Sequence, residues 1–348
     1  MNNEQPAALP AAPILVVDHL RKLFPVGAHG LLRRPQHFVH AVDDVSFTVG
    51  KQEVLAVVGE SGCGKSTLVL TLLGMETATA GSIQFHGAEV TALNAAGLKQ
   101  LRRQVQMIFQ DPYESLNPLM TIGETVAEPL RVHGLVRDAT EERRRVYRAL
   151  EDAGLKPAET YINRRPHELS GGQRQRVVIA GALILDPVVI LADEPVSMLD
   201  VSIRAEILNL LNDLRRDRGI SIILITHDLN TVSSIADRIA VMYLGRIVEI
   251  GATQQVLTKP QHPYTKALLS VAPVPNPRRR RERIILQGET PDPIHLPSGC
   301  RFHPRCPLAI DRCKEIDPAL IPVSTANGNG SPASGHSAAC ILLEAHER

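Results

Sequence analysis

Tryptophan is absent from this chain of 348 residues, and aromatic side chains make up only 3% of it. Sites for single-stranded nucleic acid depend on aromatic rings that stack on bases, so this composition argues against such a site. Charge of one sign is not in excess either, because the formal net charge is only +1. The chain thus lacks both a global basic field for DNA and the acidic excess typical of disorder, and we expect no nucleic-acid partner.

Long apolar segments are missing too. The most apolar stretch, Val177 to Ala192, is interrupted by Asp186-Pro187 and falls short of the roughly 20 residues that a membrane-spanning helix needs. The N-terminus, Met1 to Pro13, is polar and rich in Ala and Pro, without a basic segment leading into an apolar one, so no secretory signal is predicted. These features predict a cytosolic chain that reaches a membrane only through a protein partner.

Apolar residues make up 44% of the chain, enough for a sizeable core. They form short apolar strands that alternate with helices, which predicts an α/β fold with a mostly parallel sheet covered on both faces. Strands are predicted at 14–20, 41–49, 53–58, 82–85, 188–192 and 221–226. Helices are predicted at 65–74, 141–153, 172–183 and 201–216. The segment between the first two strands is predicted to be a loop, and prolines at 112, 118 and 129 interrupt the middle of the chain.

A glycine-rich loop connects the third predicted strand to the first predicted helix. Its sequence is Gly59-Glu60-Ser61-Gly62-Cys63-Gly64-Lys65-Ser66-Thr67, which fits G-x-x-x-x-G-K-S/T in the strand-to-helix context that binds nucleotide phosphates. Backbone N–H groups and the start of the helix attract phosphate oxygens. Lys65 can reach the β- and γ-phosphates and Ser66 can bind Mg²⁺, so the loop predicts an ATP site.

Two acidic residues, Asp193 and Glu194, end the apolar strand predicted at 188–192. Charges at the end of a buried strand are unfavourable unless they bind something. Asp193 is placed to hold Mg²⁺ or its water. Glu194 should point elsewhere, because successive strand residues alternate in direction, and this suits a base that activates the attacking water.

A second anion site is predicted where Leu169-Ser170-Gly171-Gly172-Gln173 precedes a helix. Ser170 can cap that helix, and the two glycines let a phosphate approach the backbone. Lying between the phosphate loop and the acidic strand, this segment resembles the signature of ABC ATPases. Three other parts resemble that family in the same order: Gln110 its Q-loop glutamine, Ser197-Met198-Leu199-Asp200 its D-loop, and His227 its switch histidine.

The resemblance spans about Ile14 to Leu269 and implies a P-loop NTPase ABC cassette. Such a cassette has a RecA-like core, an antiparallel β subdomain and a helical subdomain. Phe24 sits where the family places an aromatic that stacks on adenine, and Phe38 is the alternative.

In this family, two cassettes close head to tail around two ATP molecules. The resemblance implies that Ser170, Gly171, Gly172 and Gln173 contact the ATP of the partner cassette. It implies that Lys65, Gln110, Glu194 and His227 act in catalysis on the ATP held by this chain. The implied Mg²⁺ ligands are Ser66, Gln110 and Asp193, and Asp200 of the D-loop is also among the implied nucleotide-binding residues.

Three separate segments resemble the ATPases of dipeptide and oligopeptide permeases: Gln110 to Pro118, His262 to Leu269, and Pro297 to Pro307. This resemblance implies a peripheral protein on the cytoplasmic face of the cell membrane. Its implied partners are two transmembrane permease subunits, an extracytoplasmic solute-binding protein, and a second cassette, identical or paralogous. The same subfamily imports nickel chelates, glutathione and antimicrobial peptides, so the solute stays open.

The C-terminal region carries four of the five cysteines. The predicted division is a flexible N-terminus at 1–13, an ATP-binding domain at 14–269, and a permease-type C-terminal domain at 270–348. Arg278 to Arg283 is read as part of a solvated linker rather than a site for nucleic acid or anionic lipid. The four thiols, Cys300, Cys306, Cys313 and Cys340, are numerous enough for a 4Fe–4S cluster or a zinc site. Some relatives carry such a cluster in this tail, which favours iron over zinc and over four unconnected thiols.

Two other classes of ABC protein remain as alternatives. Those that act on ribosomes usually have two cassettes, whereas this chain has one. Those that act in DNA repair or chromosome organisation insert long coiled coils between the phosphate loop and the signature. No sustained heptad pattern separates Lys65 from Ser170 here. Export rather than import is the third alternative, and the three permease-like segments argue against it.

Overall fold

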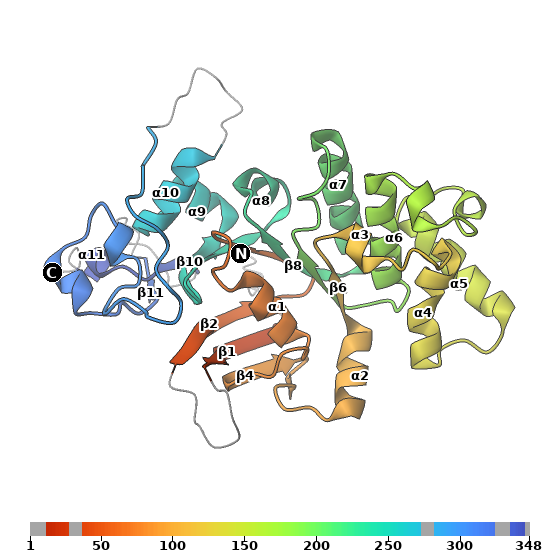
Figure 1. Cartoon of the computed structure of the whole chain (residues 1–348), viewed down its shortest axis with the longest axis horizontal. Helices are drawn as coiled ribbons and strands as arrows, with labels where there is room; N and C mark the ends of the chain where they lie inside the picture. Colours follow the sequence, from red (N-terminus) through yellow and green to blue (C-terminus); the bar gives the residue numbers. More distant parts are fainter. Residues whose placement is uncertain (1–11, 28–36, 273–281, 324–334, 345–348) are drawn as a thin grey trace, which may run out of the picture.

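The computed structural model describes residues 12–27, 37–272, 282–323 and 335–344. Residues 1–11 of the predicted flexible N-terminus, the middle of the loop after the first strand and most of the basic run at 278–283 lie outside these ranges. In the described part, a central mixed sheet lies between a helical arm at one end and the C-terminal region at the other (Figure 1).

Eight strands form the central sheet. In spatial order they are β11 (Ile321–Pro322), β12 (Ser337–Ala338), β10 (Arg246–Ala252), β9 (Arg238–Tyr243), β3 (Val54–Val58), β8 (Ser221–Thr226), β7 (Val189–Asp193) and β6 (Val105–Ile108). The five strands from β9 to β6 run parallel, and the other three add in antiparallel fashion. Every residue of β3, β7 and β8 is buried, because helices cover both faces of a parallel sheet.

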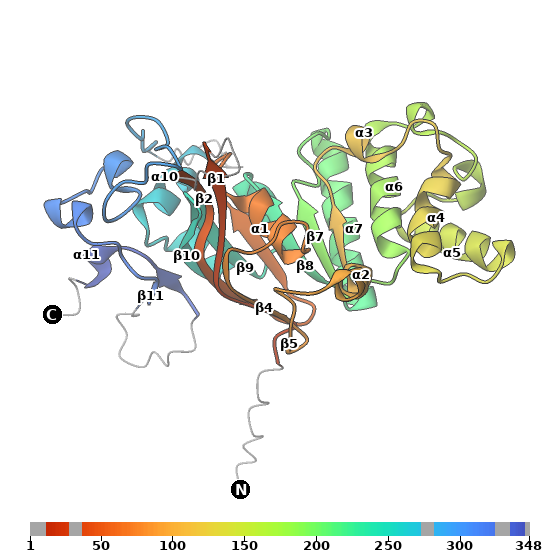
Figure 2. The ribbon, with the colours of Figure 1, turned by 60° about the horizontal axis from the view of Figure 1, so that its bottom comes forward.

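A second, antiparallel sheet lies below the central one in the view of Figure 1 and comes forward in Figure 2. Its order is β2 (His37–Val49), β1 (Leu15–Val26), β4 (Ala80–Phe85) and β5 (Ala88–Glu89). Helix α1 (Lys65–Leu72) lies between the two sheets, where Leu68, Val69 and Leu72 join the apolar core that both sheets share. The phosphate loop therefore starts in one sheet and is backed by the other.

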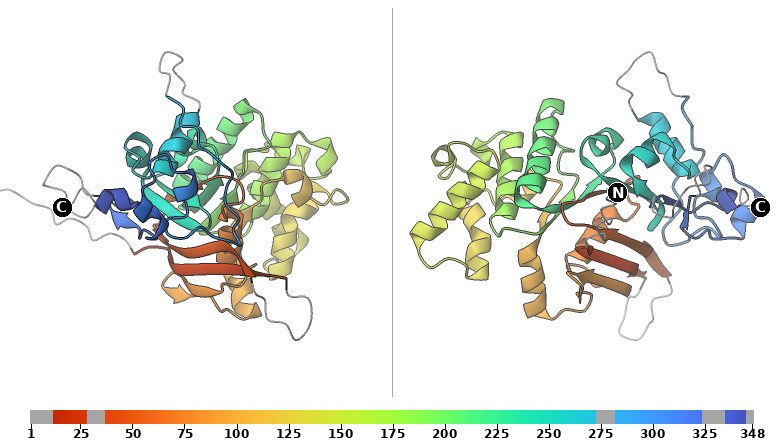
Figure 3. Two further views of the ribbon diagram at one scale, coloured as in Figure 1. Left: turned by 60° about the vertical axis from the view of Figure 1, so that its left-hand side comes forward. Right: turned by 180° about the vertical axis from the view of Figure 1, so that it is seen from behind.

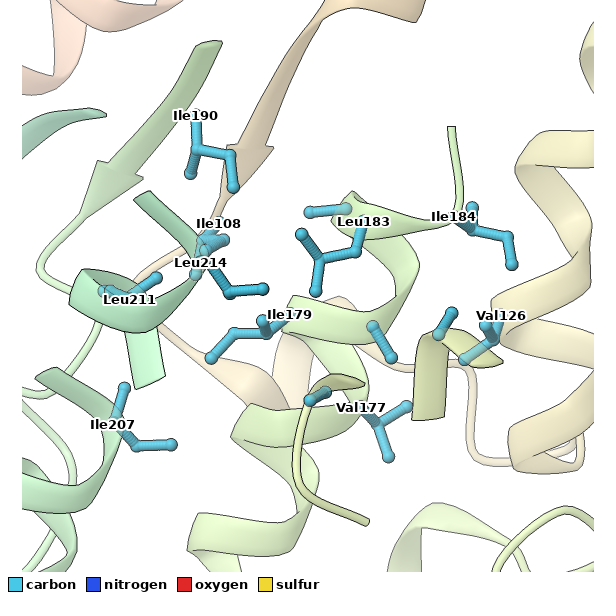
Figure 4. Packing of buried hydrophobic residues seen from close by; sticks show 14 of the residues in the cluster. Ile108, Val126, Val177, Ile179, Leu183, Ile184, Ile190, Ile207, Leu211 and Leu214 are labelled. Carbon is cyan, nitrogen blue, oxygen red and sulfur yellow. The ribbon is translucent and has the colours of Figure 1, made fainter. Parts of the chain in front are cut away.

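The helical arm forms a separate layer beyond β6. It contains α3 (Pro112–Ser115), α4 (Ile122–His133), α5 (Ala139–Asp152) and α6 (Gly171–Leu183). Its core continues into α7 (Val201–Arg218), with Val177, Ile179 and Leu183 of α6 between the arm and the central sheet (Figure 4). The arm and the central sheet therefore share one apolar cluster.

The remaining helices complete the fold. They are α2 (Ala95–Gln104), α8 (Leu229–Ile235), α9 (Thr253–Thr258), α10 (Pro263–Val271) and α11 (Ile341–Glu344). The C-terminal region wraps around α10 and returns to the central sheet through β12, as Figure 3 shows from two further sides. None of the helices in the described ranges has both the length and the apolar character needed to cross a membrane.

The predicted α/β fold with a mostly parallel sheet is confirmed, and some elements differ from the prediction. The predicted loop after the first strand is shorter, because β1 continues to Val26 and β2 already begins at His37. Pro129 does not end a helix but lies inside α4. That helix starts with a capping box between Thr121 and Glu124 and buries Leu130 after the proline, which keeps it continuous.

Candidate nucleotide site

A cleft of about 620 Å³ opens at the carboxyl ends of the parallel strands, where open α/β sheets bind ligands. Ten of the residues predicted to bind ATP line it: Phe24, Ser61, Gly62, Gly64, Lys65, Ser66, Thr67, Gln110, Glu194 and His227. Three further lining residues were not predicted: Val39, Ala41 and Pro293. Val39 lies opposite Phe24 in the β1–β2 pairing, whereas no sequence signal points to Pro293.

The phosphate loop is held by close packing against the neighbouring strands. Gly64 precedes α1 with φ +104°, and a Cβ atom there would lie 1.8 Å from the carbonyl oxygen of Ala41. Lys65 is only 6% exposed, and its Nζ donates hydrogen bonds of 2.9 Å to the carbonyl oxygens of Gly59 and Glu60. The ammonium group of Lys65 therefore lies inside the loop, next to the position that phosphates would take.

Asp193 is the buried member of the acidic pair. It is 6% exposed, and its Oδ1 has no hydrogen-bond partner among the described residues. Burial raises the pKa of Asp193 and the charge of Glu194 adds to this, whereas a hydrogen bond from the Ser66 hydroxyl opposes it. An unpaired buried carboxylate oxygen beside a hydroxyl is a set of ligands that fits Mg²⁺.

Glu194 faces the cleft from the next position. Its Oε1 lies 3.0 Å from Nδ1 of His227, and its Oε2 accepts a 3.3 Å hydrogen bond from Nε2 of Gln110. Strand β7 ends at Asp193, and Glu194 has φ +45° in the left-handed region. Its different direction therefore comes from this strained turn rather than from strand alternation.

The apolar end of the cleft is formed by β1 and β2. Phe24 pairs with Val39, and Phe38 pairs with Pro25. Because directly paired residues share one face of a sheet and neighbours alternate, Phe24 and Val39 both face the cleft while Phe38 faces away. Of the two aromatics considered for adenine, Phe24 is therefore the one at the site.

Replacement of Phe24 by Ala is expected to weaken ATP binding roughly tenfold, because base–aromatic stacking contributes about 1–3 kcal/mol. Phe38→Ala is the matched control, since it removes the same side chain from the neighbouring strand and the opposite face. Titration with a fluorescent ATP analogue measures both. An equal effect of the two substitutions would contradict the assignment of Phe24.

The signature segment lies away from this cleft. Ser170 caps α6, with its Oγ accepting from the Gln173 N–H at 3.3 Å and its own N–H donating to Gln173 Oε1 at 3.0 Å. None of Ser170, Gly171, Gly172, Gln173 or Asp200 lines the nucleotide cleft of the same chain. The D-loop nevertheless contacts the acidic pair, because Ser197 Oγ donates to the carbonyl oxygen of Glu194 at 3.0 Å.

The four C-terminal cysteines border one small apolar cavity with room for about 10 Å³, together with Pro263, Phe302 and Leu308. Burial raises the pKa of the Cys300 thiol to about 11, and it also raises the pKa of Cys306 and Cys340. Across the described ranges, no three or more His, Cys, Asp or Glu side chains are arranged to hold a metal ion. The sulfurs thus converge without forming a ready-made metal centre.

Comparison with known proteins decides the family. The family described as ABC transporter matches residues 42–197, and the family described as oligopeptide/dipeptide transporter, C-terminal region, matches residues 248–313. The dipeptide transport ATP-binding protein DppF of Haemophilus influenzae is 50% identical over 309 residues, covering 88% of this chain and 93% of that protein. This chain belongs to the ATP-binding proteins of ABC transporters.

Other relatives agree with this family. The oligopeptide transport ATP-binding protein OppF of Salmonella typhimurium is 48% identical and covers 82% of this chain and 86% of that protein. Among solved structures, a dimeric ATP-binding cassette in a post-hydrolysis state with ADP and phosphate is 29% identical, with a TM-score of 0.61. It covers 69% of this ABC protein and 98% of the solved chain. The expected cassette fold and the ABC-type ATPase are confirmed.

Proposed function

We propose that this chain is the nucleotide-binding subunit of an ABC importer that couples ATP hydrolysis to the uptake of dipeptides or oligopeptides. The observation that carries the ATPase part is the contact of Glu194 with His227 and Gln110 in the cleft that also contains Lys65. The names of the relatives support the peptide part, because they include dipeptide and oligopeptide transport.

The site residues divide the chemistry among them. The loop N–H groups and Lys65 would bind the phosphates, with Lys65 exchanging its two carbonyl partners for phosphate oxygens. Ser66, Asp193 and Gln110 would hold Mg²⁺, which neutralises phosphate charge when bound. The Glu194 carboxylate would accept a proton from the attacking water, and His227, 3.0 Å away, would keep that carboxylate in position.

A complete site would need a second cassette. In this proposal, Ser170, Gly171, Gly172 and Gln173 contact ATP on the partner, and Asp200 lies at the interface. Apolar side chains in the D-loop and directly after it support this, because Met198 is 58% exposed and Val201 is 81% exposed. The second cassette would be identical or paralogous, and both would sit on the cytoplasmic face of the membrane.

The permease subunits would dock on the segment from Tyr113 to Pro129. Tyr113 and Leu119 are exposed there by 57% and 78%. Apolar side chains of this size on one surface segment are typical of a protein contact. In this arrangement the binding face for the two transmembrane subunits begins shortly after Gln110, which contacts Glu194.

Purification from the native host tests the transport function. A tagged full-length chain, gently extracted from membranes, is expected to bring down two multi-spanning permeases and a second cassette. A solute-binding protein of the same system would then identify the solute, with peptides expected and nickel chelates, glutathione or antimicrobial peptides as the alternatives. Recovery of ribosomal or DNA-repair proteins, without membrane subunits, would contradict the proposal.

We also propose that Cys300, Cys306, Cys313 and Cys340 of a C-terminal domain spanning 270–348 hold a 4Fe–4S cluster, with zinc as the alternative. Their convergence on one cavity supports this, since Cys340 is distant in sequence from the other three. The cavity is too small for a cluster as it stands, so the thiols would have to move apart and lose their protons. Iron, sulfide and zinc analysis of anaerobically purified protein, beside a Cys313→Ser variant, distinguishes the outcomes. Protein free of all three would contradict the proposal.

A further inference from the structure

We propose that residues 290–305 of the C-terminal region form a strap that fixes the nucleotide site of the same chain, with Arg305 as the positioning residue of the phosphate loop. The inference rests on the proposed ATP site. It adds a residue from outside the ATP-binding motifs, and it gives the C-terminal region a direct role in nucleotide affinity.

Arg305 forms a bidentate ion pair with the side chain of Glu60, the second residue of the phosphate loop. Its Nη1 donates to Glu60 Oε2 at 2.8 Å and its Nη2 to Glu60 Oε1 at 3.2 Å. Thr290 Oγ1 donates to the same Oε2 at 3.0 Å. The Arg305 side chain is only 10% exposed and the Glu60 side chain 29%, so this bidentate ion pair is partly shielded from water and fixed in direction.

The backbone of Glu60 is held on its other sides. Its N–H donates to the hydroxyl of Tyr264 in α10 at 2.9 Å, and its carbonyl oxygen accepts from Nζ of Lys65 at 2.9 Å. The Glu60 side chain does not line the nucleotide cleft, so it can bind Arg305 without contacting the nucleotide. The ion pair with Arg305 fixes Glu60 and its carbonyl group, which accepts the hydrogen bond from Lys65. It therefore also fixes the position from which Lys65 reaches the phosphates.

The strap also touches the opposite end of the cleft. Pro293 lines the cleft on the side of Phe24 and Val39. The carbonyl oxygen of Pro293 accepts a 3.0 Å hydrogen bond from the N–H of His40, which lies in β2 between two cleft-lining residues. A single segment therefore braces both the apolar end of the nucleotide site and its phosphate loop.

If the Arg305–Glu60 ion pair only stabilised the fold, its removal would lower the free energy of unfolding and nothing else. The strap proposal predicts that ATP affinity falls as well. Replacing Arg305 by Met in the full-length chain is expected to raise the KM and the Kd for ATP roughly five- to tenfold, because charge-assisted hydrogen bonds are lost. The kcat should stay within about twofold, since no catalytic group is removed. Glu60→Gln should act in the same direction, and the double variant should be no worse than the stronger single variant, because both remove one interaction.

Two further variants complete the experiment. Arg312→Met is the matched control, because Arg312 is exposed in the same region and should leave KM unchanged. Arg305→Lys keeps the charge without the fork and should restore part of the affinity. It also carries the test if Arg305→Met does not fold. Wild-type affinity in the Arg305 and Glu60 variants, or additive effects in the double variant, would overturn the strap. A wild-type chain that neither binds nor hydrolyses ATP would instead overturn the proposed function.

Discussion

Replacing Glu194 by Gln is expected to lower the rate of ATP hydrolysis roughly a hundredfold or more, because a general base contributes about 10² to 10⁴. The amide has the same size and can still hydrogen-bond to Gln110 and His227, but it cannot take a proton from water. ATP binding should persist, since the phosphate loop and Asp193 are untouched. Phosphate release and nucleotide titration on the same preparation separate the two effects.

Glu151→Gln is the matched control for this experiment, because Glu151 is exposed on the helical arm and far from the acidic pair in sequence. Its hydrolysis rate should equal that of the wild type. An unchanged rate in the Glu194 variant would mean that another group activates the water. Simultaneous loss of ATP binding would mean that the strained turn at Glu194 serves the shape of the site instead.

The second large effect is expected for Gly64→Ala. The new methyl group would lie 1.8 Å from the carbonyl oxygen of Ala41, which stands in β2 between His40 and Val42, and both of these residues pair with β1. Backbone that is fixed on both sides cannot move away, so the phosphate loop has to shift. We expect a loss of more than about 3 kcal/mol in the free energy of unfolding without nucleotide, together with loss of ATP binding.

Gly62→Ala separates this clash from backbone strain. Gly62 also has a positive φ, +78°, but an added Cβ there meets nothing within 4 Å. Only the left-handed strain should remain, about 1–2 kcal/mol. Denaturant unfolding of both variants measures the difference. Equal losses would show that the packing of Gly64 against Ala41 is not what constrains the loop.

The central strands and the phosphate loop could be predicted because their signals are local. Strand β3 is wholly apolar, β7 is apolar up to Asp193, and β8 is apolar between its polar ends and spans the predicted residues 221–226. The β9–β10 pair was not predicted. It turns at Leu244-Gly245, and Leu244 with φ +41° is not a residue that favours such a turn. The sheet around that hairpin imposes the turn, so the sequence carries little sign of it.

The nucleotide site likewise contains residues that local motifs predict and residues that they do not. The motifs place Lys65, Asp193 and His227 from sequence, since each follows a recognisable strand or loop. The choice between Phe24 and Phe38 depends on the strand register, which appears only when β1 and β2 pair. Pro293 and Arg305 are distant in sequence from every ATP-binding motif, and only folding of the C-terminal region brings them to the cleft and the phosphate loop.

The C-terminal region shares the sheet that carries the phosphate loop, because β12 pairs with β10 and extends the same eight strands. Glu249 of β10 is fully buried and lies 2.8 Å from His336 next to β12. Cutting off this region would uncover a strand edge prone to self-association and leave a carboxylate without its histidine. The C-terminal region is thus an integral part of the fold. A truncated chain would aggregate before its effect on transport could be measured.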